Sequence, residues 1–189
     1  MGSTRKRITR FVAALAIALM MIAAIPAIAQ AREYTMRPVS IDATVAEDGS
    51  LTVVEERSFN FDGSFNGVYW DIPGGYHESR KIGIEVLAAE RRVGGSWSVM
   101  QVVDSASVGD DGVCTVSDRG WVTRLQIFSP ASDETVLFRI SYRVTGGVSA
   151  WSDTGELYWK FVSDGWDEPS SDVSCTVHLP VPAGETVRP

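Results

Sequence analysis

The sequence predicts an all-β domain, specifically an antiparallel β-sandwich of the immunoglobulin-like type with about seven to nine strands, preceded by a signal peptide helix. Three observations support this prediction. Apolar and polar side chains alternate with a period of two in many short runs, turns rich in Gly, Pro, Asp or Ser separate these runs, and no helical period appears after residue 31.

The first two strands form the clearest pair. Residues 39–45 alternate strictly, residues 47–50 (EDGS) predict a turn, and residues 51–61 form the second strand of a hairpin. Glu55 and Arg57 fall in the inward row of that second strand. Charged residues at inward positions indicate either a bulge or a strand that changes faces part-way.

The remaining strands are shorter and are separated by loops. Residues 62–67 predict a loop, and Trp121 and Trp159 alternate with core residues and are expected in the core. Val173, Cys175, Val177 and Leu179 are predicted to form the last buried row. Further strands are predicted at residues 82–86, 97–103, 113–116, 121–127, 138–144, 157–161 and 173–179.

The N-terminal segment is typical of an export signal. Residues 1–10 are basic, residues 11–25 (FVAALAIALMMIAAI) are apolar without interruption, and Pro26 is followed by small residues in an A-x-A arrangement. We expect cleavage after Ala31. The alternative is an uncleaved anchor, because the apolar run nearly reaches the length of a membrane helix. Either reading places the body of the chain outside the cytoplasm, in the cell envelope or secreted.

Three segments follow from these patterns. Residues 1–31 are the signal peptide, residues 32–180 are the extracytoplasmic β-sandwich domain, and residues 181–189 are a linker or a truncated end. The chain has 17 Lys and Arg against 24 Asp and Glu, and four of the bases lie in the first ten residues. The acidic body would repel phosphate backbones, so we expect no nucleic-acid partner.

Two stretches of sequence resemble a known family. The first runs from Tyr34 to Pro73 and contains EDGSLTVVEE and FDGSFNGVYWDIP; the second contains ISYRV, ELYWKFVSDGW and VHLP. Together they resemble the N-terminal extracytoplasmic domain of a family of predicted bacterial membrane proteins, the domain of unknown function DUF2207. The family's loop usually has Arg where this chain has Trp70. The resemblance implies a β-rich domain followed by membrane-spanning helices, and it brings no catalytic residue with it.

Cys114 and Cys175 are the only cysteines. An even number in an oxidising compartment predicts a disulfide between them. The alternative is two buried free thiols that each pack as a small hydrophobic side chain.

The tryptophans are the best candidates for a binding site. Trp70, Trp151 and Trp166, like Trp97, lie in or near predicted loops, where their rings could stack on a sugar or anchor a partner protein. The alternative is that these rings fill the ends of the sandwich.

No catalytic or metal-binding pattern is evident. His77 and His178 are the only histidines, neither a G-x-S-x-G nor an H-E-x-x-H motif occurs, and the acidic clusters in loops do not have EF-hand spacing. We therefore expect no enzyme activity, no metal and no cofactor.

The leading hypothesis is a non-catalytic extracytoplasmic interaction or sensing domain whose partner is another envelope protein. The membrane association would come from the N-terminal segment or from helices beyond this chain. One alternative is a cell-surface module that binds cell-wall glycan through its loop tryptophans. The other is a hydrolase with a dispersed carboxylate pair.

Overall fold

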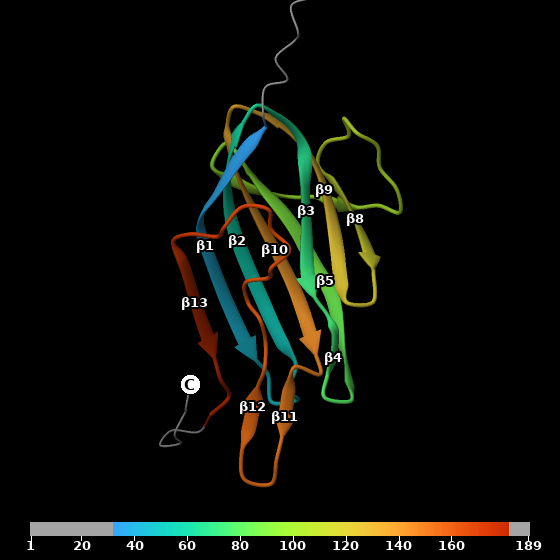
Figure 1. The fold of residues 1–189 in the computed structure, drawn as a ribbon, viewed down its shortest axis with the longest axis vertical. Helices are drawn as coiled ribbons and strands as arrows, with labels where there is room; N and C mark the ends of the chain where they lie inside the picture. The colour runs from blue at the N-terminus through green and yellow to red at the C-terminus, as the bar shows by residue number, and fades with distance from the viewer. Residues whose placement is uncertain (1–31, 182–189) are drawn as a thin grey trace, which may run out of the picture. The chain divides into compact units, whose positions relative to one another are not determined.

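The computed structural model describes residues 32–181, so the predicted signal segment 1–31 and almost all of the tail 181–189 lie outside the described residues. The described part contains thirteen strands, β1 to β13, and no helix (Figure 1). The all-β prediction is therefore confirmed. The number of strands exceeds the prediction because several are only two to four residues long, too short to show an alternating pattern.

The first sheet has the order β13-β1-β2-β10-β5-β4, with β6 also paired to β5. Its neighbouring strands are antiparallel except for β1 and β13, which run parallel. The strands are β1 (Glu33–Val45), β2 (Leu51–Asp62), β4 (Gly75–His77), β5 (Arg80–Val93), β6 (Ser96–Val99), β10 (Thr135–Thr145) and β13 (Val173–His178).

The second sheet has the order β3-β9-β8-β7, so β3 has a neighbour on one side only. Its strands are β3 (Ser64–Pro73), β7 (Gln101–Val102), β8 (Val113–Asp118) and β9 (Val122–Ser132). A separate small hairpin joins β11 (Val148–Ala150) to β12 (Gly155–Leu157).

The core lies between the inner faces of the two sheets. Phe59 of β2 contacts Phe138 of β10 in its own sheet and Trp70 of β3 in the other, with ring centroids 5.7 and 6.3 Å apart. The rows of buried residues in β1, β2, β9 and β10 alternate with exposed ones, as the period of two predicts. Burial of these apolar rows is the main force that holds the sheets together.

The segment predicted as a loop at residues 62–67 is mostly strand. β3 begins at Ser64, and a register shift against β9 between Phe65 and Gly67 marks a β-bulge. The extra residue of the bulge lies in β9, where Ser129 and Pro130 are opposite the single residue Asn66 of β3.

The strand predicted at residues 157–161 is absent. β12 ends at Leu157, and residues 158–172, here called the strap, cross from the β11–β12 hairpin to β13 without regular pairing (Figure 1). Trp159 and Phe161 in the strap are half-buried and pack against the core, so their apolar side chains are used without a strand.

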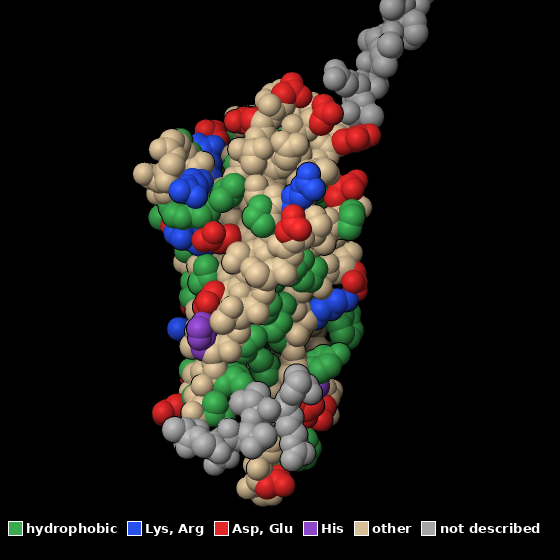
Figure 2. Space-filling model, turned by 90° about the vertical axis from the view of Figure 1, so that its left-hand side faces the viewer, with side chains coloured by type: hydrophobic (Ala, Val, Ile, Leu, Met, Phe, Trp, Pro, Cys, Tyr) green, Lys and Arg blue, Asp and Glu red, His purple; other side chains and the backbone are tan. Residues whose placement is uncertain are grey.

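The row predicted as buried on the last strand is exposed. Val173, Cys175 and Val177 all lie on the surface of β13, and Leu179 beyond it is half-buried. Among the described strands, β13 is the edge strand of the first sheet and pairs only with β1. Figure 2 shows the resulting hydrophobic side chains on the molecular surface at this edge.

Candidate functional site

A groove lies between β3 and the strap. Its cavity has a volume of about 310 Å³. Aromatic rings from four different segments line it: Tyr34 of β1, Phe59 and Phe61 of β2, Phe65 and Tyr69 of β3, and Trp166 of the strap. Because β3 has no strand neighbour on one side, the groove places these rings beside a free sheet edge.

The rings lining the groove are held by one another. Phe61 and Phe65 lie 4.6 Å apart between ring centroids, and Tyr34 contacts Phe65 edge to face at 6.1 Å. Phe59 stacks on Phe61 at 5.8 Å. Such contacts fix the orientation of the rings, so the groove is formed before any partner arrives.

Gly67 brings β3 close to β9 at the edge of this groove. Its φ is +143°, and a Cβ at this position would lie only 1.8 Å from the carbonyl oxygen of Ile127. Only glycine permits this approach, so the bulge and the shape of the groove depend on this residue.

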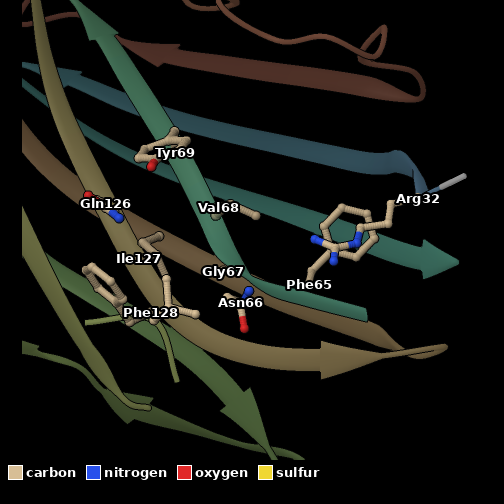
Figure 3. A pocket seen from close by; sticks show the side chains of 10 residues that line it. Arg32, Phe65, Asn66, Gly67, Val68, Tyr69, Gln126, Ile127 and Phe128 are labelled. Atoms are coloured by element: carbon tan, nitrogen blue, oxygen red, sulfur yellow. The ribbon is translucent and has the colours of Figure 1, made fainter. Parts of the chain in front are cut away.

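A second cavity, of about 240 Å³, shares part of the wall of the groove. Phe65, Gly67, Val68 and Tyr69 line both cavities, and β9 supplies residues 126–128 to the second one. Figure 3 shows these side chains arranged along β3 and β9 around Gly67. The first half of β3 is therefore hollowed on both sides.

Trp166 forms the wall of the groove that the strap contributes. Its ring contacts Trp70 edge to face at 5.4 Å and lies 4.7 Å from the guanidinium carbon of Arg57. Arg57 Nη1 also donates a hydrogen bond of 2.7 Å to Ser170 Oγ. Two points of the strap are thus attached to one buried arginine by a cation–π contact and a hydrogen bond.

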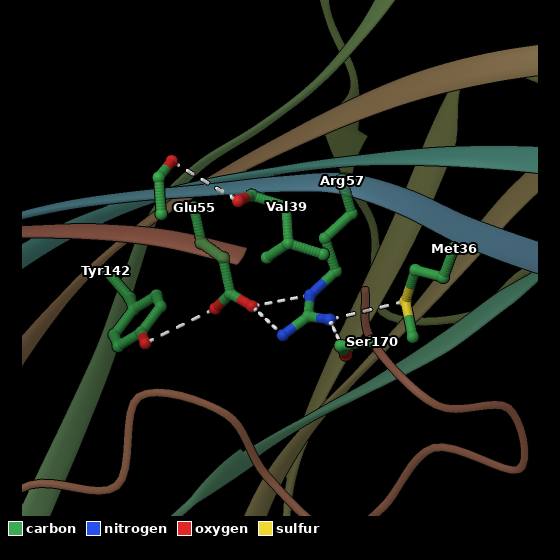
Figure 4. A network of polar contacts seen from close by, with 7 residues as sticks. Met36, Val39, Glu55, Arg57, Tyr142 and Ser170 are labelled. Carbon is green, nitrogen blue, oxygen red and sulfur yellow. Dashed lines mark hydrogen bonds and ion pairs between the residues drawn. The ribbon is translucent and has the colours of Figure 1, made fainter. Parts of the chain in front are cut away.

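Arg57 is itself paired with Glu55 in the core of β2. Arg57 Nε donates to Glu55 Oε1 at 2.5 Å, the guanidinium forms a salt bridge with the same carboxylate, and the two side chains are 1% and 4% exposed (Figure 4). Tyr142 donates a hydrogen bond of 3.5 Å to the other carboxylate oxygen. Burial raises the pKa of the Glu55 carboxyl, and the charge of Arg57 opposes this rise.

The sequence prediction of a bulge or face change at this pair is corrected by the register. Glu55 and Arg57 pair with Ile140 and Phe138 of β10 without interruption, so β2 keeps its face and both charges point inward. The irregularity lies in the neighbouring strand β1, between Met36 and Val39. The inward charges were visible in the sequence, but nothing in it indicated that they were paired with each other to hold the strap.

An ion pair lies at one end of the groove. Arg124 of β9 donates to both carboxylate oxygens of Asp71 in β3 at 2.6 Å, and its guanidinium carbon lies 4.9 Å from the ring of Tyr69. The side chains of Arg124 and Asp71 are 29% and 14% exposed. This end of the groove can therefore offer charged hydrogen-bonding groups to a partner, next to the apolar rings.

The three tryptophans predicted as binding residues lie in three different environments. Trp70 lies in β3 and is 1% exposed, so it supports the groove from below and cannot reach a ligand. Trp166 contacts it and lines the groove. Trp151 is exposed in the turn between β11 and β12, away from both. The geometry brings Trp70 and Trp166 together and leaves Trp151 apart.

Trp121 was misassigned by sequence reasoning. It was expected in the core but is 72% exposed, and its ring contacts that of Tyr76, which is 61% exposed. Trp121 precedes β9 by one residue. Its place beyond the end of the strand is the reason that the alternating pattern does not apply to it.

The predicted disulfide between Cys114 and Cys175 is not formed. Both cysteines are free; Cys114 is buried in β8 of the second sheet and Cys175 is exposed on β13. The segment just before β7 forms a backbone hydrogen bond with Ala89 of β5, which places β7 and its neighbour β8 near β5. In the first sheet, β13 lies four strands away from β5. Four strand spacings amount to about 19 Å, whereas a disulfide needs Cα atoms within about 7 Å.

The histidines and acidic residues do not form a site. His178 Nε2 lies 3.0 Å from Asp42 Oδ2 on the surface, and His77 stacks on Tyr158 with ring centroids 4.7 Å apart. Within residues 32–181, no three His, Cys, Asp or Glu side chains gather closely enough to hold a metal ion.

Comparisons with known proteins identify the family and little else. No curated protein matches the chain. One solved structure, from Parabacteroides distasonis, is of a protein whose assignment as a protease is provisional; it shares 9% identity over 59% of this chain and 23% of its own length, at a TM-score of 0.30. A likeness at this level supports no conclusion about fold or function. No helix within the described range is long and apolar enough to cross a membrane.

A family model, by contrast, matches nearly the whole domain. The model describes the N-terminal domain of a predicted membrane protein, and it covers residues 35–188. This match includes both stretches that suggested the resemblance, except for Tyr34, together with all strands from β2 to β13. The chain therefore belongs to the DUF2207 family of predicted membrane proteins and contains its N-terminal domain.

Proposed function

We propose that this domain is a non-catalytic, extracytoplasmic interaction domain that binds an extended segment of a partner protein along the free edge of β3. The observation that carries the proposal is the coincidence of an unpaired strand edge with a groove of fixed aromatic rings. The family description and the basic, apolar N-terminal sequence support an exported location in the cell envelope.

The chemistry of the groove favours a peptide in strand conformation. A strand added to β3 would make main-chain hydrogen bonds with the free edge, and every second side chain would point toward the cavity. The rings of Phe61, Phe65 and Trp166 suit apolar side chains, and the Asp71–Arg124 pair suits a polar or charged group at one end. The alternative of glycan binding through three loop tryptophans receives less support, because Trp70 is buried.

The proposal is tested with a library of ten-residue peptides that alternate apolar and polar residues, added to the full chain. We expect at least one peptide to bind and to slow amide hydrogen exchange at those residues of Val68 to Asp71 whose amides face away from β9, because the free edge becomes hydrogen-bonded. Phe65→Ala should weaken this binding by about tenfold, the effect of losing one buried aromatic contact.

Trp97→Ala is the matched control, because Trp97 lies against Arg139 in the first sheet and does not line the groove. This variant should bind the peptide as the unaltered chain does. The proposal is wrong if no peptide in the library binds, or if the bound peptide protects amides elsewhere and leaves β3 exchanging at its free rate.

A further inference from the structure

One end of the domain carries a group of exposed aromatic side chains that the groove does not use. We call it the aromatic end and define it by Tyr76, Trp121, Trp151 and Tyr158. These side chains are 61%, 72%, 56% and 63% exposed. In Figure 1 this end contains β4 and the β11–β12 hairpin, whereas the first half of β3, with the groove, lies toward the opposite end.

The exposed rings are held in place by their surroundings. Tyr76 and Trp121 meet edge to face with centroids 6.3 Å apart, and Tyr158 stacks on His77. The ring of Trp121 also lies against the backbone of Gly75, where an added Cβ would come within 2.4 Å of it. Large apolar rings held in exposed positions are unusual on a surface that contacts only water, because their exposure to water is unfavourable.

The hairpin that carries Trp151 is attached to the same end. Arg80, which follows β4 in the chain, donates a hydrogen bond of 2.8 Å to the carbonyl oxygen of Val148 in β11. Arg80 also bonds to the Ser149 hydroxyl. The base of the hairpin is therefore attached to the β4–β5 turn, and Tyr158, which follows the hairpin, stacks on His77 of β4.

The charges around these rings are mixed. Arg80, Lys81 and Arg119 lie close in sequence to Glu78 and Asp118, and Lys81 and Asp118 form an exposed ion pair at 3.7 Å. Tyr and Trp side chains combined with balanced charges suit the headgroup region of a bilayer, where one part of the ring contacts hydrocarbon and its polar atom contacts water.

The direction of the last strand also supports a membrane as the partner of the aromatic end. The family description places this domain on the N-terminal side of a membrane protein, so the rest of such a protein joins it after its last strand. β13, the last strand, runs toward the aromatic end (Figure 1). The continuation of the domain and its exposed aromatic rings thus share one end.

From these observations we propose that the aromatic end rests in the headgroup interface of a lipid bilayer, with Trp121 and Trp151 in contact with lipid and the groove along β3 directed away from the membrane. This contact is independent of what the groove binds. It rests on apolar and dipolar interactions of the rings and needs no anionic lipid.

The test uses the chain from Arg32 onward, the form expected after cleavage of the export signal, mixed with phosphatidylcholine vesicles whose acyl chains are brominated near the headgroup. Bromine quenches tryptophan fluorescence only at short range, and this form lacks the apolar residues 11–25, so quenching reports a contact made by the domain itself. We expect brominated lipid to reduce the fluorescence of the unaltered chain relative to unbrominated lipid.

Two variants decide which tryptophans are quenched. The double variant Trp121→Phe, Trp151→Phe should lose this quenching, whereas Trp97→Phe, which alters a ring in the first sheet, should keep it. Both variants change only side chains that are not fully buried, so both should fold. Absence of quenching in the unaltered chain, or equal quenching in both variants, would overturn the proposal and favour a protein partner for the aromatic end.

Discussion

Arg57 of β2 contacts both β1 and the strap. It bonds to Glu55, to Ser170 and to the sulfur of Met36 at 3.3 Å, and it lies over the ring of Trp166. A buried ion pair adds little net stability by itself, because desolvation of both charges offsets their attraction. Here the ion pair positions Arg57, which holds the strap, a segment without regular structure, against the core.

Removal of the arginine should therefore be costly. Arg57→Ala leaves the Glu55 carboxylate buried without its partner and releases the strap at two points, and we expect the free energy of unfolding to fall by about 3–5 kcal/mol. Urea denaturation followed by circular dichroism measures this change.

A double variant separates the cost of the unpaired charge from the loss of the strap contacts. Glu55→Leu with Arg57→Met keeps the volume apolar and removes both charges, so it should be clearly more stable than Arg57→Ala. If the double variant proves as unstable as the single one, the unpaired carboxylate is not the source of the loss, and our account of the pair is mistaken.

The sequence predicts where this pair of charged residues lies but not what the pair contacts. Glu55 and Arg57 were recognisable as inward-facing charges from their spacing of two residues in β2. Their contacts with Ser170 and Trp166 could not be predicted, because a separation of more than a hundred residues leaves no local pattern.

Among the elements, β3 and the strap show the limits of periodicity. In β3 the Gly and Asn residues opposite the bulge resembled a loop, and from the end of β12 into the strap the alternation of Leu157, Trp159 and Phe161 resembled a strand. A period of two reports only that every second side chain is apolar. Whether the backbone also finds a pairing partner depends on neighbours that are distant in sequence.

The close approach of β3 to β9 leads to a prediction about a single glycine. Gly67→Ala would place a methyl group against the Ile127 carbonyl and would also force an alanine into a backbone conformation that favours glycine. We expect a loss of about 3 kcal/mol or more in the free energy of unfolding, from strain and overpacking together, measured by thermal or urea unfolding.

Gly155→Ala is the control for this substitution. Gly155 begins β12, and an added Cβ there would meet no atom within 4 Å. It should change stability by no more than about 0.5 kcal/mol, as is usual for a surface site. Similar losses for the two variants would show that the close approach of β3 to β9 is not what requires glycine at position 67.

For the whole molecule, the sequence predicted the class of fold and missed the relation between the sheets. Alternation in β1, β2, β9 and β10 sufficed to indicate a layered β structure. It could not show that β13 would add to β1 in parallel at the edge of the first sheet, where its apolar row is left uncovered. Cysteine number alone was likewise a poor guide, because pairing depends on which strands are neighbours.

The reactivity of the two cysteines tests whether they are free and how far each is exposed. A thiol reagent added to the native chain should react with one exposed thiol, Cys175, while Cys114 reacts only after unfolding. Burial raises the pKa of both thiols, and Asp42 adds to the rise at Cys175, so the first reaction should itself be slow at neutral pH and faster as pH rises.

Unfolding without reductant should then release the second thiol and give two in total. Cys175→Ser should abolish the reaction of the native chain and leave the reaction after unfolding, which assigns each phase to its residue. If the unreduced, unfolded chain shows no reactive thiol, Cys114 and Cys175 are joined. β8 and β13 would then have to be neighbours, and the arrangement of the two sheets described above would be incorrect, because these strands lie too far apart in it for a disulfide.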